Sequence, residues 1–397
     1  MAGITSAVEL AEAGRNVILV EKEAYLGGNV VRMNSYFPKF CPPNCGLEIN
    51  YRRIRSNRRI TVLTHSVVDR IEGQAGDFKV SIKRSPRYIN DFCTSCGKCA
   101  EVCPVEIQND FNYGFNTRKA AYLPHGMAFP ASYAIDADAC KGKECGKCLE
   151  VCDYKAIDLE AKEEMIDLVA DRIIFATGWK HYDAGGIENM GYAFPNVVTN
   201  MEFERLLAVN GPFGGKLLRP SDQKEPEKIA FVQCAGSRDE NHLPYCSAVC
   251  CSASVKHALT VAERYPKSEI SIFYIDLRLS GRNEDLLVKA KASENIHFIK
   301  GKVGMVTETE TGSHLIVEAE DILSGKKIKD EFDLVVLATG IVPNDPHHTV
   351  RKDGAGFALA DQQDGIIVAA TARQPMDVSA SVKDGTAAAI KSLRKLN

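Results

Sequence analysis

The sequence lacks any long hydrophobic segment and any strong excess of charge. Its apolar runs, such as residues 334–337, are as long as single strands and far shorter than the roughly 20 residues that cross a bilayer. The N-terminus has no apolar core of the signal type. The 397 residues carry a formal net charge of −3, too little for an electrostatic footprint on nucleic acid or anionic lipid. We therefore expect no nucleic-acid partner and no direct membrane span, and a cytoplasmic chain that meets the inner membrane face only through partners.

A complete glycine-rich dinucleotide fingerprint is also missing. The opening residues, MAGITSAVELAEAGRNVILV, predict a helix over 4–13 closed by Gly14 and a buried strand over 17–20. This is the second half of a strand–turn–helix–strand unit, in which Gly3 takes the place of the third glycine of G-x-G-x-x-G. Because the first strand and the first two glycines do not occur, we expect a truncated or misassigned start, with roughly 10 to 15 residues absent.

The residues after this strand favour a site for flavin adenine dinucleotide (FAD). Glu21 stands where a carboxylate binds the adenosine ribose hydroxyls, although a solvated glutamate at a strand end is the alternative. Two glycines then follow at the distance expected for close backbone approach to the flavin. Near the C-terminus, a helix continuing from about residue 382 is expected to direct its N-terminal turn at the ribityl phosphate. The predicted flavin contacts are Gly3, Glu21, Lys22, Gly27, Gly28, Ala176, Thr177, Gly178, Asp377 and Val378.

Two Ala-Thr-Gly signatures indicate two nested domains. One follows a buried strand at residues 176–178, and a near copy ends a strand at residues 338–340. In flavoproteins of the thioredoxin reductase type, such a strand returns the chain between the two dinucleotide-binding domains. The fold class is therefore expected to be α/β, with two nested dinucleotide-binding, thioredoxin reductase-like domains.

Eight of the fourteen cysteines form two similar runs. CTSCGKCAEVCP has the spacing of a bacterial [4Fe–4S] run, and CKGKECGKCLEVC repeats it with a wider first gap. The fourth cysteine of each run is expected on a following helical turn, as a ligand of the other cluster. We predict an inserted ferredoxin-like α+β domain with two [4Fe–4S] clusters, with structural zinc and plain thiols as alternatives. The two ligand sets are Cys93, Cys96, Cys99 and Cys152, and Cys140, Cys145, Cys148 and Cys103. The segment over 112–136 between the runs reads as a packed linker.

The second dinucleotide-type domain has no phosphate-binding glycine loop. A strand over 229–233 and a helix from about Ser252 flank a turn that contains only Ala235-Gly236-Ser237, so hydride entry from a nicotinamide is disfavoured. The turn instead holds four cysteines, and their spacing leaves a third [4Fe–4S] cluster, a zinc site and a reactive dithiol open. These four are Cys234, Cys246, Cys250 and Cys251.

The last two cysteines, Cys41 and Cys45, form a nonspecific C-x-x-x-C pair soon after the flavin glycines. Buried or helper thiols are the first interpretation. A redox disulfide facing the flavin ring and additional cluster ligands are the alternatives.

The motifs VEKEAYLGG, RYINDFCTSCGKCAEVCPV, IIFATGW and VQCAGSRDENHLPYCSAVCCSASVKHA, in this order, resemble the A-type subunits of heterodisulfide reductase over essentially the whole chain. This resemblance implies FAD and a third, nonstandard [4Fe–4S] cluster on the four cysteines of the second domain. The short C-terminus and NVVRMNSYFPKFCPPNCGLEINYRRI make the chain more similar to the A-type subunits of the quinone-interacting membrane-bound oxidoreductase complex of sulfate reducers.

This resemblance implies an electron-transfer subunit between the menaquinone pool and a soluble reductase such as adenylylsulfate reductase. Its partners in the complex would be a second flavo-iron–sulfur protein and a quinone-reactive haem b protein. The alternatives are a bifurcating subunit of a heterodisulfide reductase, a pyridine-nucleotide:disulfide oxidoreductase that uses Cys41 and Cys45, and a non-enzymatic scaffold. The expected domains are 1–85, 161–225 and 346–397 for FAD, 86–160 for the ferredoxin-like insertion, and 226–345 for the second dinucleotide-type domain.

Overall fold

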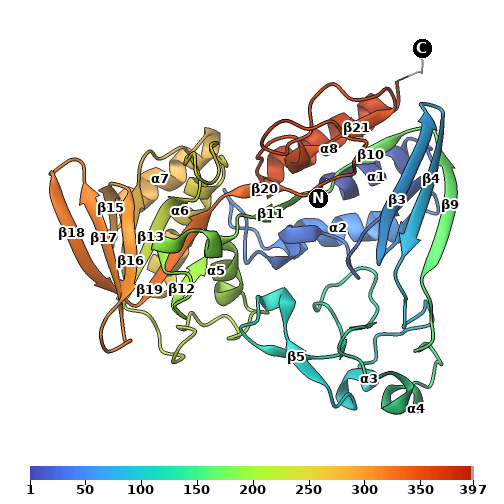
Figure 1. Cartoon of the computed structure of the whole chain (residues 1–397), viewed down its shortest axis with the longest axis horizontal. Coiled ribbons are helices and arrows are strands. Elements are labelled where there is room, and N and C mark those ends of the chain that lie inside the picture. Colours follow the sequence, from blue (N-terminus) through green and yellow to red (C-terminus); the bar gives the residue numbers. More distant parts are fainter. Residues whose placement is uncertain (395–397) are drawn as a thin grey trace.

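The computed structural model describes residues 1–394, so the last three residues of the predicted 346–397 domain lie outside the described residues. Figure 1 shows a sheet flanked by helices at one end, a group of helices in the middle, and a loop-rich part with short helices below them. Within residues 1–394, no helix is long and apolar enough to cross a membrane.

The second dinucleotide-type domain is built on a five-stranded parallel sheet in the order β12-β19-β13-β14-β15. Every residue of β19 is buried, as expected for a parallel strand covered on both faces. Helix residues such as Phe203 and Val255 pack against Phe231 of β13 on one face. The strands are β12 (Val197–Thr199), β13 (Lys228–Ala235), β14 (Glu269–Tyr274), β15 (Ile296–Lys300) and β19 (Leu334–Thr339), and the helices are α5 (Asn200–Leu207), α6 (Cys250–Arg264) and α7 (Glu284–Lys291).

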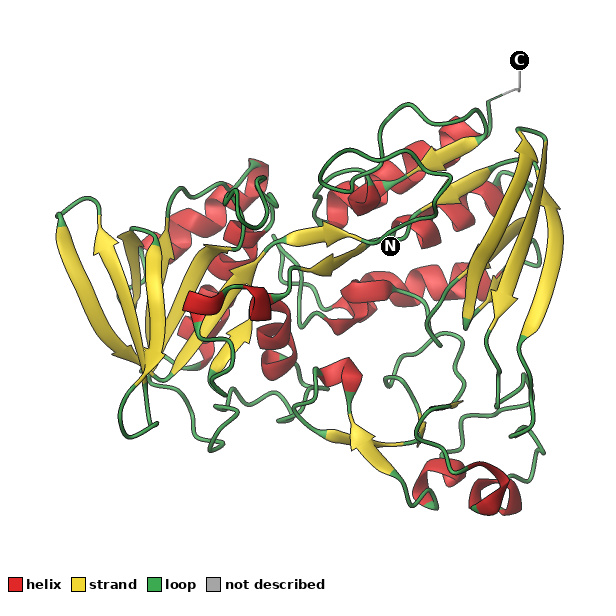
Figure 2. Ribbon diagram, viewed as in Figure 1, coloured by secondary structure: helices red, strands yellow, loops and turns green. Residues whose placement is uncertain are grey.

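An antiparallel sheet covers the other face of this domain, at its outer end (Figure 2). It contains β16 (Val303–Glu308), β17 (Leu315–Asp321) and β18 (Lys326–Phe332). Phe332 meets Phe273 of β14 edge to face, with ring centroids 6.0 Å apart. The parallel sheet is therefore enclosed between helices and a second sheet, which removes its apolar side chains from water.

The first domain contains two separate pairs of parallel strands. β1 (Val17–Val20) pairs with β2 (Ile60–Leu63), and β10 (Ile173–Phe175) pairs with β21 (Ile366–Val368). No strand within residues 1–394 joins the two pairs. Helix α1 (Ala2–Glu12) packs on α8 (Val378–Ser392), where a Cβ on Gly385 would lie 2.7 Å from the Ala2 carbonyl oxygen. Helix α2 (Pro43–Ser56) packs against α1. That a strand precedes Met1 stays a prediction.

An antiparallel sheet of β3 (Ser66–Gln74), β4 (Asp77–Arg84) and β9 (Glu164–Ala170) marks where the insertion leaves and re-enters the first domain. Arg84 at the end of β4 is paired with Glu164 at the start of β9, and Ile89 forms a bridge with Ile157. The chain between these pairs therefore leaves and returns at closely spaced points, in the region where the sequence places the insertion. Its limits at residues 86 and 160 stay predictions.

The insertion has little regular structure. Its elements are α3 (Lys98–Glu101), α4 (Lys147–Glu150), the pair β5 (Glu106–Gln108) and β6 (Thr117–Lys119), and the pair β7 (Ala121–Tyr122) and β8 (Ala134–Ile135). Strands β11 (Trp179–His181) and β20 (Ile341–Pro343) pair and connect the two dinucleotide-type domains. The 3₁₀ helices are η1 (Gly28–Arg32), η2 (Asp110–Asn112), η3 (Gly142–Glu144), η4 (Ala184–Gly186), η5 (Glu188–Met190), η6 (Gly281–Asn283) and η7 (Ala370–Ala372).

Three predicted boundaries are wrong. Helix α8 begins at Val378, not near 382, because the Asp377 side chain accepts a hydrogen bond from the Ala380 N–H at 2.7 Å and caps the helix there. Helix α6 begins at Cys250, two residues before the predicted Ser252. The boundary at 225/226 also fails, because β12 pairs with β19 and so joins the second domain's sheet.

Gly340 lies at the connection between the two dinucleotide-type domains, and substituting it tests how tightly this connection is packed. A Cβ at this position would lie 2.4 Å from Ser237 Oγ and 2.7 Å from Ser247 Oγ. We expect Gly340→Ala to destabilise the protein by about 1–3 kcal/mol through overpacking, measured as a lower thermal midpoint. Gly354→Ala is the matched control, since a Cβ there meets open space. Equal midpoints for the two variants would contradict this view of the packing.

Candidate flavin and iron–sulfur sites

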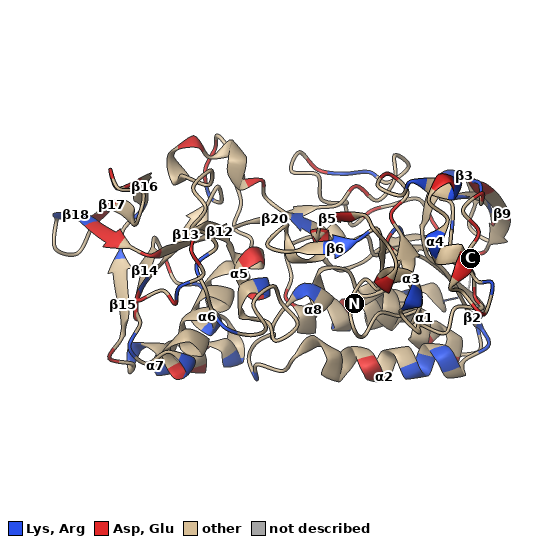
Figure 3. Cartoon of the chain, turned by 90° about the horizontal axis from the view of Figure 1, so that it is seen from below, with Lys and Arg blue, Asp and Glu red and all other residues tan. Residues whose placement is uncertain are grey.

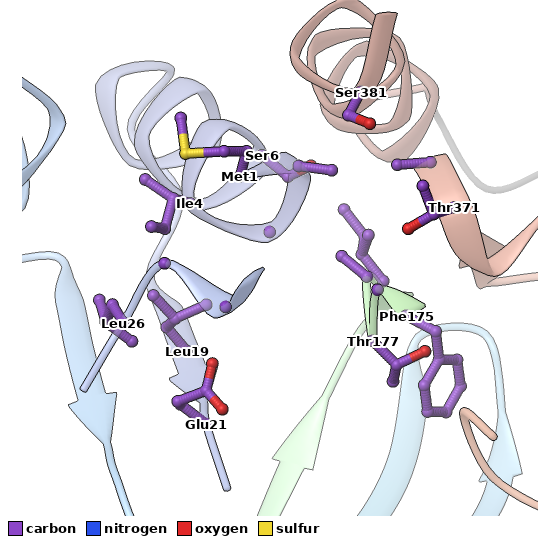
Figure 4. Close-up of a pocket in the computed structure, with 18 of the residues that line it drawn as sticks. Met1, Ile4, Ser6, Leu19, Glu21, Leu26, Phe175, Thr177, Thr371 and Ser381 are labelled. Carbon is purple, nitrogen blue, oxygen red and sulfur yellow. The ribbon is translucent and has the colours of Figure 1, made fainter. Parts of the chain in front are cut away.

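A cavity of about 1620 Å³ lies between the strand pairs of the first domain. In Figure 4, Leu19 and Glu21 stand on one side of it and Phe175 and Thr177 on the other, while Ser381 belongs to α8 above them. All ten predicted flavin contacts line this cavity. The structure therefore brings together residues from both ends of the chain, and their contact with a flavin stays a prediction.

Glu21 is fixed at the cavity end of β1. Its backbone N–H donates to the Leu63 carbonyl oxygen at 2.8 Å, and its Oε1 accepts from the Glu23 N–H at 3.1 Å. Burial raises the pKa of the Glu21 carboxyl. A carboxylate held in this way is suited to accept hydrogen bonds from hydroxyl groups. Lys22 is a residue of the rim, since its side chain is 64% exposed and pairs only with Glu23 at 3.7 Å.

The predicted glycines serve different purposes. A Cβ on Gly3 would lie 3.3 Å from Ala176 Cβ, so this glycine lets α1 approach the end of β10. Gly27 has a φ of +118°, and a Cβ on it would lie 2.4 Å from Val31 Cγ1, so the turn itself requires glycine. Gly28 has nothing within 4 Å of its Cβ position, which leaves its backbone open beside the cavity.

The first Ala-Thr-Gly segment is fastened to the second domain. The Asn344 side-chain amide donates to the Thr177 carbonyl oxygen at 2.9 Å, and the Asn29 amide donates to the Trp179 carbonyl oxygen at 2.6 Å. Sequence reasoning missed both asparagines, because nothing in the local pattern of an asparagine tells which distant carbonyl it will meet.

The N-terminal end of α8 forms another part of the cavity wall. Val378 and Ser381 line the cavity there, and the Asp377 carboxylate is occupied by its own helix as the N-cap. The helix dipole and the free N–H groups of the first turn favour an anion at this end. A phosphate at this end, as the sequence predicts, would therefore meet favourable electrostatics.

A buried charged group lines the cavity opposite the strands. Lys256 Nζ donates to the Ser35 carbonyl oxygen at 2.6 Å and contacts the Glu204 carboxylate, which also lies 2.7 Å from His257 Nε2. The three side chains are 2%, 4% and 1% exposed for Lys256, Glu204 and His257. Burial alone would raise the pKa of Glu204, but the Lys256 and His257 contacts hold it well below its usual range, and burial lowers the pKa of His257.

Sequence reasoning missed this group. Lys256 and His257 are one turn beyond the cysteines of α6, whereas Glu204 comes from α5, and only the packing of the two helices brings them together. No short-range spacing could have signalled it.

The segment over 112–136 packs as predicted, and it also contributes to the cavity. Tyr113 lines the cavity, and Asn112 Oδ1 accepts a hydrogen bond from the fully buried Arg205 at 2.9 Å. His125 stacks on Phe111 with ring centroids 5.2 Å apart, and burial lowers the pKa of His125 to about 4. The segment therefore joins the ferredoxin-like insertion to the wall of the cavity.

The cysteines of the insertion mix between the two runs. Cys103 of the first run lines one small pocket together with Cys140, Cys145 and Cys148 of the second. Burial and then the neighbouring sulfur of Cys93 raise the pKa of Cys99 to about 12, with Cys148 and Cys96 also contributing. Cys103 and Cys152 come just after the short helices α3 and α4, not on a following helical turn. This placement is compatible with the predicted cross-ligation, which stays a prediction.

Cys152 reaches the first run through a chain of backbone contacts. Its Sγ accepts from the Ala156 N–H at 3.3 Å, and the Ala156 carbonyl accepts from the Asn90 N–H at 2.9 Å. The Asn90 carbonyl in turn accepts from the Cys93 N–H at 3.2 Å. The start of the first run and the end of the second are thus held together.

The quartet of Cys234, Cys246, Cys250 and Cys251 converges at the N-terminal end of α6. Burial, followed by the three neighbouring thiols, raises the pKa of Cys250 far above its ordinary value. Cys250 Sγ is 3.6 Å from the Thr339 carbonyl oxygen, and Cys251 Sγ is 3.7 Å from the Asp276 carbonyl oxygen. The quartet therefore lies between the ends of β13, β14 and β19.

None of the fourteen cysteines, including Cys41 and Cys45, forms a disulfide within residues 1–394. Cys41 is half-buried and bridges to Tyr36, and Cys45 is exposed at the start of α2. The roles considered for this pair stay predictions. Among residues 1–394, no group of three or more His, Cys, Asp or Glu side chains could hold a single metal ion. Figure 3 shows that acidic and basic residues are interspersed along the chain.

The chain is similar to known proteins in sequence and in fold. Residues 86–108 match the family model of the 4Fe-4S binding domain. The chain is 38% identical to a CoB–CoM heterodisulfide reductase iron-sulfur protein of the A type from Methanopyrus kandleri, over 100% of this chain and 63% of that protein. It is 37% identical to the A-type protein of the ferredoxin/F(420)H(2)-dependent CoB-CoM heterodisulfide reductase of Methanosarcina acetivorans, over 100% of this chain and 52% of that protein.

The chain is thus homologous over its whole length to the A-type subunits of heterodisulfide reductases, which are oxidoreductases, and it spans about half to three-fifths of their length. Among solved structures, thioredoxin reductases from Lactococcus lactis and T. acidophilum are similar, both with a TM-score of 0.53 and coverage of 98% of this chain and 94% of theirs. Their identities are only 14% and 12%, so the likeness concerns the fold. The predicted fold class is confirmed.

The Glu204–Lys256 pair gives a prediction for the cavity wall. Lys256→Met leaves a buried carboxylate without its main partner, which we expect to cost about 3–5 kcal/mol of unfolding free energy. The double variant Lys256→Met/Glu204→Gln should recover part of this loss, because it also removes the charge. Lys22→Met, on the exposed rim, is the control, with a loss below about 1 kcal/mol. Comparable unfolding midpoints for Lys256→Met and Lys22→Met would refute the role of the buried pair.

Proposed function

We propose that the chain is a flavin- and iron–sulfur-containing electron-transfer subunit of an oxidoreductase of the heterodisulfide reductase type. The observation that carries the proposal is the placement of α6. Its N-terminal turn carries Cys250 and Cys251 of the cysteine quartet. Ala253, Lys256 and His257 of the same helix line the large cavity. One helix therefore adjoins both proposed cofactor sites.

The cavity residues fit FAD. Glu21 offers a carboxylate for ribose hydroxyls, and the N-terminal turn of α8 offers N–H groups and a positive dipole end for phosphate. Gly28 leaves open space for a close approach. The quartet and the two ferredoxin-like sets fit [4Fe–4S] clusters, because a cluster takes four thiolates. Ligation would also offset the burial and the mutual repulsion that raise the pKa of Cys99, Cys148 and Cys250.

FAD exchanges electrons in pairs and [4Fe–4S] clusters exchange them singly, so the bound cofactors would supply conversion between the two. The residues of the chain itself fix the surroundings of this exchange. The Glu204 carboxylate and the Lys256 ammonium hold a compensated pair of charges in the cavity wall, and neutral His257 lies against them. Such preorganised charges need no rearrangement when an electron arrives.

Two more specific roles are candidates for this electron-transfer subunit. The names of the relatives include ferredoxin and a CoB-CoM heterodisulfide, which favours a subunit that divides electron pairs between a ferredoxin and a disulfide. The segment over 29–54 supports the other candidate, a subunit that links the menaquinone pool to adenylylsulfate reductase, with a second flavo-iron–sulfur protein and a haem b protein as partners. Purification of the native complex separates them, since only the second candidate brings a haem b protein with this chain.

Entry of electrons from a pyridine nucleotide has little support. The turn after β13 contains Gly236, and a Cβ there would meet Tyr182 at 2.8 Å and Ile187 at 2.9 Å. Side chains fill the space beside this glycine, so the turn does not form an open binding site for phosphate. The second domain therefore offers a cysteine quartet where a nicotinamide-binding domain has its phosphate loop.

The cofactor content is the first test. We expect anaerobic expression, with any coding sequence that precedes Met1 retained, to yield about twelve iron atoms, about twelve labile sulfides and about one FAD per chain. Cys246→Ser should lower the iron content by about four, because it removes one ligand of a single cluster. Cys45→Ser is the matched control and should change nothing. About eight iron atoms in the unaltered chain would contradict a cluster on the quartet.

A further inference from the structure

Arg238 lies in the loop that carries the cysteine quartet. Its Nη2 is 3.0 Å from Asp276 Oδ2, and the Asp276 carbonyl oxygen is 3.7 Å from Cys251 Sγ. Its backbone N–H donates to the Tyr245 carbonyl oxygen at 3.1 Å, next to Cys246. Both the main chain and the side chain of Arg238 are thus fixed beside quartet cysteines.

The other terminal nitrogen of this guanidinium, Nη1, is buried and has no hydrogen-bond partner among residues 1–394. A buried N–H without an acceptor is costly, so in a native site it usually faces a group that completes it. The side chain as a whole is 25% exposed, so its charge is only partly screened. Arg238 also has a φ of +58°, an uncommon conformation for a side-chain-bearing residue that the surrounding loop must maintain.

Cys234 lies in the same tight turn as Arg238, because the Ser237 N–H donates to the Cys234 carbonyl oxygen at 3.1 Å. Burial raises the pKa of Cys234, and the neighbouring positive charge of Arg238 acts in the opposite direction. Cys234 also has a positive φ of +58°, at the irregularity between Val232 and Ala235 that interrupts the pairing of β13 with β19. This irregularity and the turn that follows it place Cys234 and Arg238 in one short segment of the chain.

We propose that Arg238 is a positioning residue that donates hydrogen bonds to the sulfur atoms at the quartet and sets the reduction potential of the cluster bound there. The inference rests on the proposed function, because it requires a cluster on the quartet. Reduction adds one electron and no bond is made or broken, so the reduced cluster is more negative by one charge. A cation and N–H donors stabilise that form more than the oxidised form and raise the potential. Asp276 fixes the guanidinium, and its own charge is half exposed and more strongly screened.

The test is an EPR-monitored titration with dithionite of the full chain with all its cofactors. The quartet signal is the one that Cys246→Ser abolishes. In Arg238→Gln, we expect the ratio of reduced to oxidised quartet cluster at a fixed potential to fall about tenfold, which is about 59 mV for one electron. Lys302→Gln is the matched control: it removes one positive charge from an exposed ion pair with Asp239, at 2.9 Å, beside the same loop, and should change the ratio less than about twofold.

Each outcome bears on a different claim. An unchanged ratio in Arg238→Gln with about twelve iron atoms retained overturns the role of Arg238 and leaves the proposed function intact. About eight iron atoms in the unaltered chain, with no signal to titrate, refutes the proposed cluster itself. If Arg238→Gln does not retain its iron, Arg238→Lys decides, since lysine keeps the charge and loses the forked donors. A ratio lowered about threefold or more in Arg238→Lys supports the proposal, and an unchanged ratio overturns it.

Discussion

The parallel pairing of β13 with β19 is the constraint on which both candidate sites depend. It places Ala235 opposite Thr339, so the loop that follows β13 lies against the second Ala-Thr-Gly segment. The Ile341 N–H then donates to Ser247 Oγ at 2.8 Å, and Cys250 Sγ lies beside the Thr339 carbonyl. Strand β20 continues from this point and pairs with β11, which leads into the cavity wall at Trp179. A single strand pairing thus positions the quartet and the connection to the cavity.

Helix α6 starts beside this strand pairing and contributes both to the cysteine quartet and to the cavity wall. Its first turn carries thiols whose ionised, thiolate form is disfavoured by burial and by mutual repulsion. Metal ligation would stabilise the thiolate form. One turn later, Lys256 and His257 are buried against Glu204, where removal from water is compensated by close contacts among the three. These side chains of α6 are therefore costly to bury unless other groups compensate them. The proposed electron transfer rests on the groups that would do so.

Much of the arrangement is predictable from the sequence, for physical reasons. The two nested domains follow from buried strands that end in Ala-Thr-Gly, and the insertion follows from ferredoxin spacing, because a cluster imposes short-range spacing on its ligands. The cavity residue Glu21 was predictable because it stands at the end of a strand whose hydrophobic pattern is clear. These features are local, so a single sequence carries them.

The rest depends on contacts between distant segments. Glu204 meets Lys256 only because α5 packs on α6, and Tyr113 reaches the cavity only because the linker folds back over the first domain. The pairing of β12 with the second domain's sheet was not predicted, because a strand of three residues has almost no recognisable hydrophobic pattern. The start of α8 was misplaced because the role of Asp377 as the helix cap was not considered.

The central claim is that the second domain passes single electrons through its cysteine quartet and does not accept hydride from a nicotinamide. The most direct measurement is anaerobic stopped-flow absorption of the flavin after mixing the intact protein with NADH, NADPH or a one-electron reductant. The account predicts that the one-electron reductant bleaches the flavin and that neither pyridine nucleotide does so at a useful rate. Rapid, saturable bleaching by NADH or NADPH would contradict it.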